Sequence, residues 1–345
     1  MNKKHFAFAL FASLMLLLAA CGGSDDTTDT DTANEGGDDG EVYTLQAGHS
    51  LPDTHPYHIS FLEMAENVAE RTDGRVNIEV FANSEIGAEY ELTEGMTLGT
   101  VDLVVSSTAP VTNFVPELAV LDLPFLFNDR DSAVEILNSE IGDEMLDKME
   151  DKGIVGLSWA ENGFRHITNS KHPIEKPEDL KGLKIRTQEN DIHLAAFEEL
   201  GALATPMAWT EALTALQQGT LDAQENPLIV ADQFSLYESK QKYMTLTGHV
   251  YSVAIFMMSK ETYDKLPEDL RDIVVEEGQR IGEVQRDLLI KMDEEALQVL
   301  KDNDVEVIED VDIQPFQDIV KGVYDDFEAE YGYGEVLEKI LEAQE

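Results

Sequence analysis

Short apolar segments alternate with amphipathic segments along this chain, and that order limits the folds open to it. The first alternating segments are a strand at Val42–Ala47, a helix at Pro56–Arg71, a strand at Val76–Phe81, a helix at Ala88–Leu98 and a strand at Val101–Ser106. Strand–helix–strand order favours a mostly parallel β-sheet with helices packed on it. Ligands of such sheets bind beyond the carboxyl ends of the strands. His49, Glu89 and Ser107 lie near such ends, or at the helix starts that follow, and are candidate ligand contacts.

A second α/β unit is predicted to open after Asn162, and a length of 345 residues favours about two domains. Domain I is assigned to residues 42–162 plus about 251–290, and domain II to residues 163–250 plus about 291–345. Each domain has its own strands and helices in this assignment.

A long helical pattern near the C-terminus begins at Pro267 and continues to about Leu300. It predicts a helix of ~33 residues, or ~50 Å, which is long enough to touch both domains. Gly278 and Gly282 weaken the pattern, so two shorter helices are the alternative.

Two arginines stand on predicted strands within Asn162–Thr187. Arg165 lies in the strand Phe164–Thr168 and Arg186 in the strand Leu183–Thr187, and a proline-rich loop joins the two. A guanidinium group offers a rigid fork of donors that matches a carboxylate, and it stays protonated. Two such groups on neighbouring strands of an acidic chain predict a pocket for a small carboxylate. The alternative is that both are ordinary surface residues at strand ends.

The first 20 residues are predicted to be a signal peptide. Lys3 and Lys4 precede an apolar run at Phe6–Leu18, and a run of about 13 residues is shorter than the ~20 that cross a bilayer. Leu18-Ala19-Ala20-Cys21 resembles a bacterial lipobox, and Cys21 is the only cysteine. The lipobox rule implies cleavage before Cys21 and a lipid anchor on its sulfur. The alternative is a soluble export signal with a coincidental cysteine; either way, no intramolecular disulfide can form.

The segment after Cys21 and the overall charge indicate where the protein works. Residues 21–41 are rich in Asp, Thr and Gly and have little apolar surface to bury, so a disordered tether is predicted. The chain has 70 acidic and 24 basic residues and a net charge of −46, which argues against nucleic acid as a partner. This charge fits an extracytoplasmic protein in salty or alkaline medium, because ~1 M salt reduces the screening length to about 3 Å.

Motifs of common enzyme classes are absent from the sequence. No phosphate-binding or dinucleotide-binding glycine pattern is present, and Gly156–Ala160 lacks the second glycine of a nucleophile elbow. His55 and His58 stand at a predicted helix start, where packing or solvated roles outweigh metal binding. A binding protein without cofactor or metal is therefore predicted, rather than an enzyme.

A series of short blocks resembles the solute-binding proteins of TRAP transporters, in the C4-dicarboxylate-binding or DctP-type branch. The blocks are Gly48-His49, Phe81–Gly87, Asn113–Glu117, Asp122–Phe127, Asn162–Asn169, Lys181–Arg186, Thr205–Trp209, Ala215–Gly219 and Asp222–Pro227. The resemblance implies an α/β fold similar to type II periplasmic binding proteins: two α/β domains with a cleft between them, joined by crossing strands and a long helix. It also implies delivery of an organic acid to small and large membrane subunits that a sodium gradient drives.

Roles for four site residues follow from this resemblance. Arg186, in K-G-L-K-I-R, matches the arginine that forms a two-pronged salt bridge with the ligand carboxylate, and Arg165 matches a supporting arginine. Trp209, after P-M-A, matches an aromatic residue that packs on the ligand. Asn226, in Q-E-N-P, matches an asparagine that hydrogen-bonds the carboxylate.

Contacts from the first domain vary with the substrate in the family and are expected around His49, Glu89 and Ser107. Family members that bind sialic acid have a glutamate at the position of Ser107, so sialic acid is disfavoured. A C4-dicarboxylate, a sugar acid and a short hydroxy or keto acid all remain compatible, and Ser107 and His49 slightly favour a hydroxyl-bearing ligand.

Two other functions remain open from the sequence. One is an extracellular sensor that binds the same ligand and signals to a membrane partner. The other is a hydrolase or lyase that orients a carboxylate substrate through Arg165 and Arg186, although no nucleophile–base pair stands nearby. A monomer is expected, because no amphipathic surface helix is left unassigned.

Overall fold

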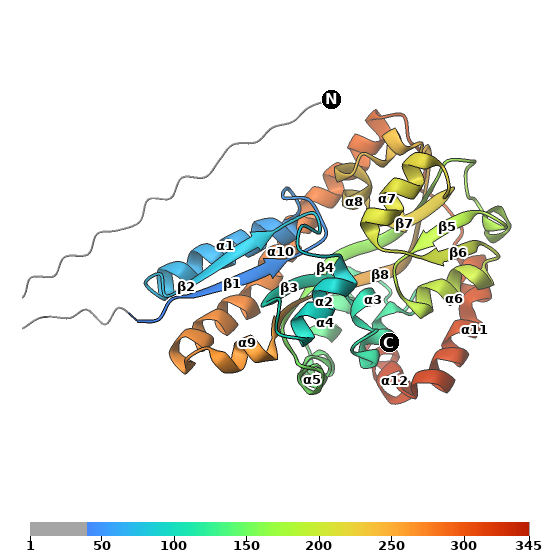
Figure 1. The fold of residues 1–345 in the computed structure, drawn as a ribbon. Coiled ribbons are helices and arrows are strands. Elements are labelled where there is room, and N and C mark those ends of the chain that lie inside the picture. The colour runs from blue at the N-terminus through green and yellow to red at the C-terminus, as the bar shows by residue number, and fades with distance from the viewer. Residues whose placement is uncertain (1–39, 345) are drawn as a thin grey trace, which may run out of the picture. The chain divides into compact units, whose positions relative to one another are not determined.

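The computed structural model describes residues 40–344, and Figure 1 shows the course of the chain. The predicted signal peptide, Cys21 and nearly all of the predicted tether lie outside the described residues. Residues from Glu41 onward form one compact unit. Within the described part of the chain, no helix combines the length and the apolar character that crossing a membrane requires.

Strands and helices alternate along most of the described chain. The strands are β1 (Tyr43–Gly48), β2 (Val76–Phe81), β3 (Leu103–Ser107), β4 (Ile154–Asn169), β5 (Lys184–Thr187), β6 (Leu203–Pro206), β7 (Ala223–Asn226), β8 (Tyr243–Ser259) and β9 (Glu306–Ile308). The first α-helices are α1 (Pro56–Arg71), α2 (Glu89–Thr97), α3 (Thr108–Val111), α4 (Arg130–Leu137), α5 (Glu140–Lys148) and α6 (Asp191–Glu199). The later ones are α7 (Trp209–Gln218), α8 (Leu228–Gln233), α9 (Lys260–Lys265), α10 (Glu268–Asp302), α11 (Gln314–Tyr331) and α12 (Gly334–Glu342). Short 3-10 helices are η1 (Pro116–Asp122), η2 (Glu150–Lys152), η3 (Pro177–Leu180) and η4 (Leu236–Ser239).

The described strands form one mixed sheet in the order β2-β1-β3-β8-β4-β7-β5-β6, with β9 paired to β8. Strand β1 is parallel to β2 and β3, and β5 is parallel to β6 and β7. In contrast, β4 and β8 are antiparallel to each other, and each is antiparallel to the trio beside it. The predicted mostly parallel sheet is therefore right for the outer trios and wrong for the centre.

Strands β4 and β8 pair along their lengths and carry the two trios at opposite ends. Strand β3 pairs with Ala254–Met258, near the C-terminal end of β8, and β7 pairs with His166–Asn169, at the C-terminal end of β4. Because β4 and β8 are antiparallel, their C-terminal ends lie far apart. Each trio with its helices forms one α/β lobe, which confirms the predicted fold class. The residue boundaries assigned to the two domains stay a prediction.

Strand β4 unites the predicted strand Phe164–Thr168 with Ile154–Trp159, an apolar segment that the sequence also predicts as a strand of its own. The polar residues Glu161 and Asn162 and the glycine that follows interrupt the apolar pattern, which is why the sequence suggested two strands. The register shifts between Glu161 and Gly163, and Gly163 has a φ of +117°, a value that favours glycine. The strand is thus continuous but irregular at its middle.

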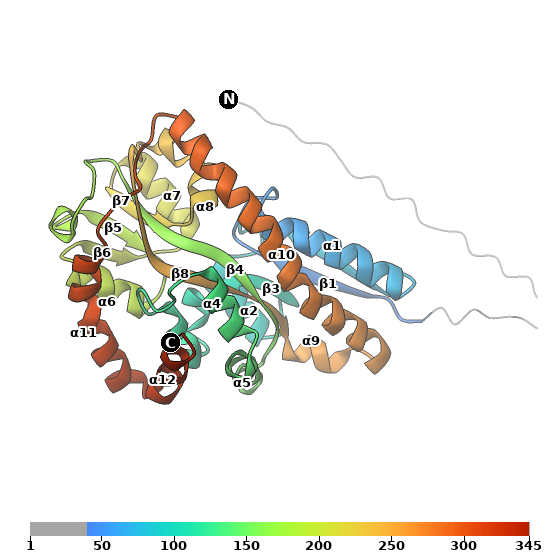
Figure 2. The same ribbon diagram turned by 180° about the vertical axis from the view of Figure 1, so that it is seen from behind.

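Helix α10 is a single helix, so the alternative of two shorter helices is wrong. It packs on α1, on β4 and on α8, as Figure 2 shows from behind. A Cβ atom on Gly282 would lie 2.2 Å from the carbonyl oxygen of Trp159, and one on Gly278 would lie 2.6 Å from Leu157 Cδ1. The two glycines therefore let the helix lie close against β4.

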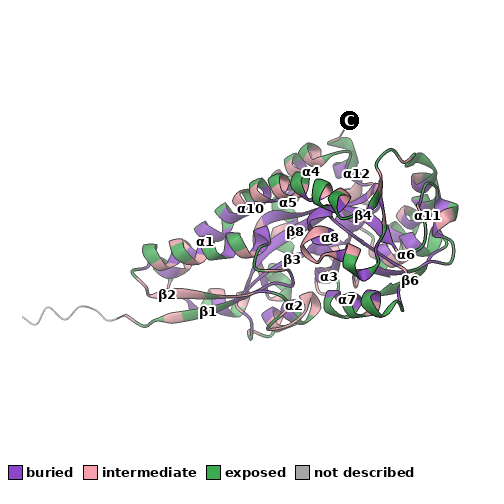
Figure 3. Cartoon of the chain, turned by 90° about the horizontal axis from the view of Figure 1, so that it is seen from above, coloured by how far each residue is buried: buried purple, intermediate pink, exposed green. Residues whose placement is uncertain are grey.

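Two hydrophobic cores occupy the two faces of the sheet. Residues of β8 alternate between them: Val253, Ile255 and Met257 belong to one core, and Ala254, Phe256 and Met258 to the other. Figure 3 shows the central strands β3 and β8 as buried and the outer faces of the helices as exposed, whereas the edge strand β2 is only partly buried. Burial on both faces explains why this strand is a nearly continuous apolar run.

Candidate functional site

A small cavity brings together many of the residues that the sequence singled out. Its lining residues are Ser50, Leu51, Glu89, Asn162, Arg186, Gln188, Trp209 and Asn226. They come from both lobes and from the middle of β4. The cavity measures about 10 Å³, which is room for about one water molecule. A larger cavity of about 820 Å³ lies between α4, α5, β4 and α10 and is lined by none of these residues.

Arg186, on β5, is a buried cation that forms no salt bridge within the described residues. Its side chain is 2% exposed, and its Nε donates to the carbonyl oxygen of Met207 at 2.8 Å. The guanidinium lies 5.3 Å from the centre of the Trp209 ring. Burial lowers the pKa of Arg186 to about 10, because desolvation disfavours the charged form, yet the group stays protonated at neutral pH. Since a buried unpaired charge costs free energy, this position is suited to an anion.

Arg165, on β4, differs from Arg186 because its charge is already compensated. Its Nη2 donates to Oε1 of Glu225 at 2.8 Å, and its Nε donates to Oε2 of the same carboxylate. Burial raises the pKa of Glu225, but the charge of Arg165 and a hydrogen bond from His249 oppose this and hold the pKa below its usual range. Nη1 of Arg165 is buried without a partner in the described chain. One edge of this guanidinium thus remains available.

The two arginines are not on neighbouring strands, which corrects the sequence-based expectation. Strand β7 lies between β4 and β5 and contributes Glu225, which binds Arg165. A carboxylate between two buried guanidinium groups reduces their mutual repulsion. The sequence order of the strands concealed this arrangement, since β7 follows both of them in the chain.

Trp209 and Asn226 both line the cavity, at the start of α7 and the end of β7. Nε1 of Trp209 is buried and donates no hydrogen bond within the described residues. Asn226 accepts from Nη2 of Arg165 at 3.1 Å and donates to Oε1 of Gln224 at 2.6 Å. An amide nitrogen carries two hydrogens, so one N–H of Asn226 is still free to donate.

The three candidates from the first lobe differ in their positions. Glu89, at the start of α2, lines the cavity, and its Oε1 accepts from Oγ of Ser107 at 3.4 Å. Ser107 contacts Glu89 but does not itself line the cavity. His49 is fully buried away from it: Nε2 lies 3.0 Å from Nδ1 of His58, and the ring packs against Tyr57. Burial lowers the pKa of His49 to about 3, so the ring is neutral at neutral pH.

Four lining residues were missed by the sequence analysis: Ser50, Leu51, Asn162 and Gln188. Ser50 and Gln188 follow the carboxyl ends of β1 and β5, and the rule on ligand sites in α/β sheets points to such positions. Asn162 lies in the middle of the long strand β4, where no sequence pattern marks it as a site residue.

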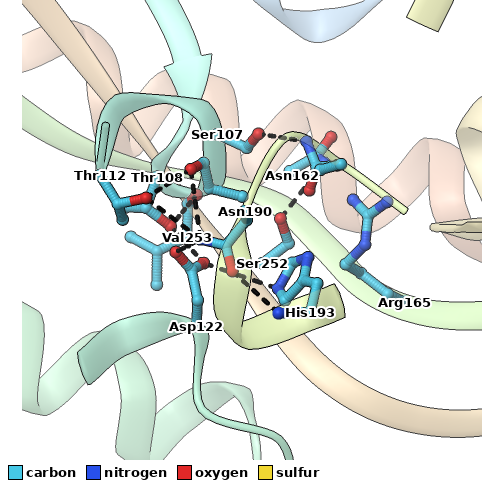
Figure 4. Close-up of polar contacts among 12 residues, drawn as sticks. Ser107, Thr108, Thr112, Asp122, Asn162, Arg165, Asn190, His193, Ser252 and Val253 are labelled. Carbon is cyan, nitrogen blue, oxygen red and sulfur yellow. Dashed lines mark hydrogen bonds and ion pairs between the residues drawn. The ribbon is translucent and has the colours of Figure 1, made fainter. Parts of the chain in front are cut away.

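A polar network beside the cavity joins the two lobes (Figure 4). Nδ2 of Asn190, after β5, donates to Oδ2 of Asp122 at 3.0 Å. Oγ1 of Thr108, after β3, donates to Oδ1 of Asp122 at 2.8 Å. Nε2 of Gln188 likewise donates to Oγ of Ser107 at 2.7 Å. These contacts connect the segment that carries Arg186 to the first lobe.

Comparison with known proteins places the chain in a family. The profile of the family described as bacterial extracellular solute-binding protein, family 7 (DctP), matches residues 47–330. A solute-binding protein of Verminephrobacter eiseniae is 43% identical over 280 residues, 81% of this chain and 83% of that protein. The sensor alternative finds no support in these matches.

Two solved structures resemble this one closely. A TRAP periplasmic solute-binding protein of a Polaromonas species, bound to D-erythronate, has a TM-score of 0.83 and 40% identity, and the match covers 86% of this chain and 98% of that one. A sugar acid-binding protein of Advenella mimigardefordensis, in complex with galactonate, has a TM-score of 0.84 and 35% identity, over 88% and 98% of the two chains. The chain therefore belongs to the DctP family of extracellular solute-binding proteins, which serve TRAP transporters.

Proposed function

We propose that this protein binds a small organic-acid anion outside the cytoplasm and delivers it, chemically unchanged, to the membrane subunits of a TRAP transporter. The observation that carries this proposal is the buried, unpaired guanidinium of Arg186 beside a cavity that both lobes line. The structures of relatives with D-erythronate and galactonate support the same class of ligand.

In this proposal, buried donors at the cavity and on the neighbouring Arg165 hold the carboxylate. Arg186 presents the fork of its guanidinium, and Nη1 of Arg165, Nε1 of Trp209 and one N–H of Asn226 add unused donors. Each charge-assisted hydrogen bond contributes about 1.5–3 kcal/mol when water is excluded. Two or three such bonds, with packing on Trp209, supply the ~8 kcal/mol of a micromolar site.

The ligand needs the lobes to move apart before it can enter. A cavity of about 10 Å³ is too small for an acid of several heavy atoms. The links that would bend are the irregular middle of β4, the paired strand β8 and helix α10. Domain I then comprises residues 42–162 and about 251–290, and domain II residues 163–250 and about 291–345.

The remaining parts of the proposal concern location, assembly and chemistry. Residues 1–20 act as a signal peptide, and a lipid on Cys21 holds the protein at the cell membrane, in the periplasm or on the outer face. The protein works as a monomer, which light scattering of the purified protein tests. It is not a hydrolase or lyase, and recovery of the bound acid unchanged after long incubation tests that point.

Arg186→Lys is the variant that tests the proposed function. A lysine keeps the charge but replaces the planar fork with a point charge, so we expect affinity for the wild-type ligand to fall at least about 30-fold. Isothermal titration calorimetry measures it, with thermal shift against a panel of organic acids to find the ligand first. Arg75→Lys is the matched control, since Arg75 forms only a surface ion pair with Asp269. Equal affinities of Arg186→Lys and wild type would refute the proposal.

A further inference from the structure

The same cavity carries hydrogen-bond acceptors that no donor within the described residues satisfies. Oε1 of Gln188 and Oδ1 of Asn162 are buried and have no partner. Glu89 lines the cavity with them, and its two hydroxyl donors, Ser106 and Ser107, both bond to Oε1. Its second oxygen, Oε2, accepts none of the hydrogen bonds found in the described chain. Buried acceptors without donors cost free energy, so the two amide oxygens indicate what the ligand must offer. Glu89 is only half-buried, and its Oε2 adds a third acceptor at the wall of the cavity.

The orientation of the Gln188 amide follows from its neighbours. The carboxylate of Glu89 only accepts, so the single hydrogen of the Ser107 hydroxyl is donated to it. Ser107 therefore accepts from Gln188, and the atom of Gln188 that faces it, at 2.7 Å, is the amide nitrogen. This hydrogen-bond relay leaves the amide oxygen of Gln188 as the group without a partner.

The charges at the cavity allow one carboxylate and disfavour a second. Arg186 is the only cationic residue that lines the cavity, and Glu89 is the only anionic one. The charge of Arg165 is compensated by Glu225. A second carboxylate on the ligand would meet Glu89 and two amide oxygens, all of them acceptors, and would be repelled.

We propose that the ligand is a monocarboxylate with several hydroxyl groups, and that Gln188, Asn162 and Glu89 determine this specificity. The inference deepens the proposed function and rests on it. The carboxylate binds Arg186, and the ligand hydroxyls donate to Oε1 of Gln188, Oδ1 of Asn162 and Oε2 of Glu89. Succinate lacks the hydroxyl donors, and every four-carbon diacid carries the disfavoured second charge.

The first experiment compares acids by calorimetry on the wild-type protein at pH 7.5. The probes are D-erythronate, both threonate enantiomers and galactonate, against succinate and butanoate, which lack hydroxyl groups. An acceptor left without a donor costs about 1–3 kcal/mol, so the best hydroxylated acid should bind about 10- to 100-fold more tightly than either unhydroxylated acid.

Two outcomes would overturn the inference, and they are distinguishable. Succinate binding as tightly as the best hydroxylated acid, with Arg186→Lys abolishing that binding, would overturn the inference and leave the proposed function standing. No binding of any of these acids at millimolar concentration would contradict both.

Two variants then test the named residues. Gln188→Met keeps the length of the side chain and removes the amide oxygen, so affinity for the best hydroxylated acid should fall about 10-fold while butanoate changes less than about twofold. Glu89→Gln removes the repulsive charge, so succinate should bind more tightly than it does to wild type. Gln217→Met and Glu85→Gln change exposed residues and serve as matched controls. If both site variants lower the affinity for every acid by the same factor, Gln188 and Glu89 only support the structure of the site. The assignment of these residues to specificity would then be wrong.

Discussion

The two buried arginines show how a neighbouring residue decides what a side chain does. Arg165 has Glu225 as a fixed counter-ion, whereas Arg186 has only a backbone carbonyl oxygen and an aromatic face. Breaking a buried ion pair by removing one partner typically costs about 3–5 kcal/mol, so the pair of Arg165 and Glu225 supports the structure. Arg186 carries the uncompensated charge that a ligand can use. Residue type alone makes the two equivalent.

Asp122 is a second residue whose environment sets its behaviour. Its carboxyl group is fully buried where α3, η1 and α6 meet, with Thr108, Asn190 and His193 around it (Figure 4). Burial raises the pKa of Asp122 from 3.8 to about 7, although hydrogen bonds from Thr108 and Asn190 oppose the shift. His193 beside it has a pKa lowered to about 3 by burial and stays neutral at neutral pH.

Asp122→Asn should change how the free energy of unfolding depends on pH. Between the unfolded pKa of 3.8 and the folded pKa of about 7, the folded state binds more protons at Asp122 than the unfolded state does. The contribution of the Asp122 carboxyl group to the free energy of unfolding of the wild type is therefore fully present below about pH 4. It is lost as the pH rises through about 7. The free energy of unfolding of Asp122→Asn, measured relative to that of the wild type, should therefore be a few kcal/mol higher at pH 8 than at pH 4. Urea unfolding across this range measures the difference, and a constant difference would contradict the assignment.

Helix α10 links the lobes because it is long and because two of its residues have no side chain. Gly278 and Gly282 face β4, where the backbone of Trp159 and the side chain of Leu157 leave no room for a Cβ atom. Glycine in a helix interior lowers intrinsic helix stability by about 1 kcal/mol relative to alanine. Close packing against β4 offsets that cost here, so the sequence pattern overstated the weakness of the helix.

Gly282→Ala and Gly322→Ala should therefore have opposite effects on stability. A Cβ atom at Gly282 would overlap the carbonyl oxygen of Trp159, so we expect a loss of at least about 2 kcal/mol. Gly322 lies in α11, and a Cβ atom there meets nothing within 4 Å, so alanine should add about 0.5–1 kcal/mol. Chemical denaturation measures both. Stabilisation by Gly282→Ala would mean that α10 does not lie against β4 in this way.

The whole molecule combines a candidate ligand site, lined by residues of both lobes, with a predicted attachment to the membrane. Such an attachment keeps a binding protein near its transporter, so each ligand captured travels a short distance. Two features of the sequence predict it: the apolar run that ends before Cys21 and the polar segment that follows.

Cys21→Ser should release the protein from the membrane fraction without changing ligand affinity, because the serine cannot receive the lipid. Fractionation of expressing bacteria, followed by immunoblotting, measures the distribution. Gly22→Ser introduces the same side chain one position later and is the matched control. A wild-type protein found mainly in the soluble fraction would support the alternative of a cleaved, unlipidated signal.

The sequence by itself determined the types of most secondary-structure elements and singled out Arg186, Trp209 and Asn226, which line the cavity from the second lobe. Helical and strand periodicities are local, so Pro56–Arg71 and Val76–Phe81 were predicted at the bounds that the structure shows. The motif around Arg186 is equally local and placed that arginine in the candidate site. Patterns within a few residues carry this information without reference to distant parts of the chain.

Only the tertiary structure decided which residues lie side by side. Glu225 reaches Arg165 across 60 positions of sequence, and Gln188 reaches Ser107 across 81. These contacts depend on the strand order, which inserts β7 between β4 and β5 and joins the trios through β4 and β8. Periodicity reports which face of an element is buried but not which element covers it. The compensated charge of Arg165 and the unsatisfied acceptors of the cavity therefore emerge only when the sheet is assembled.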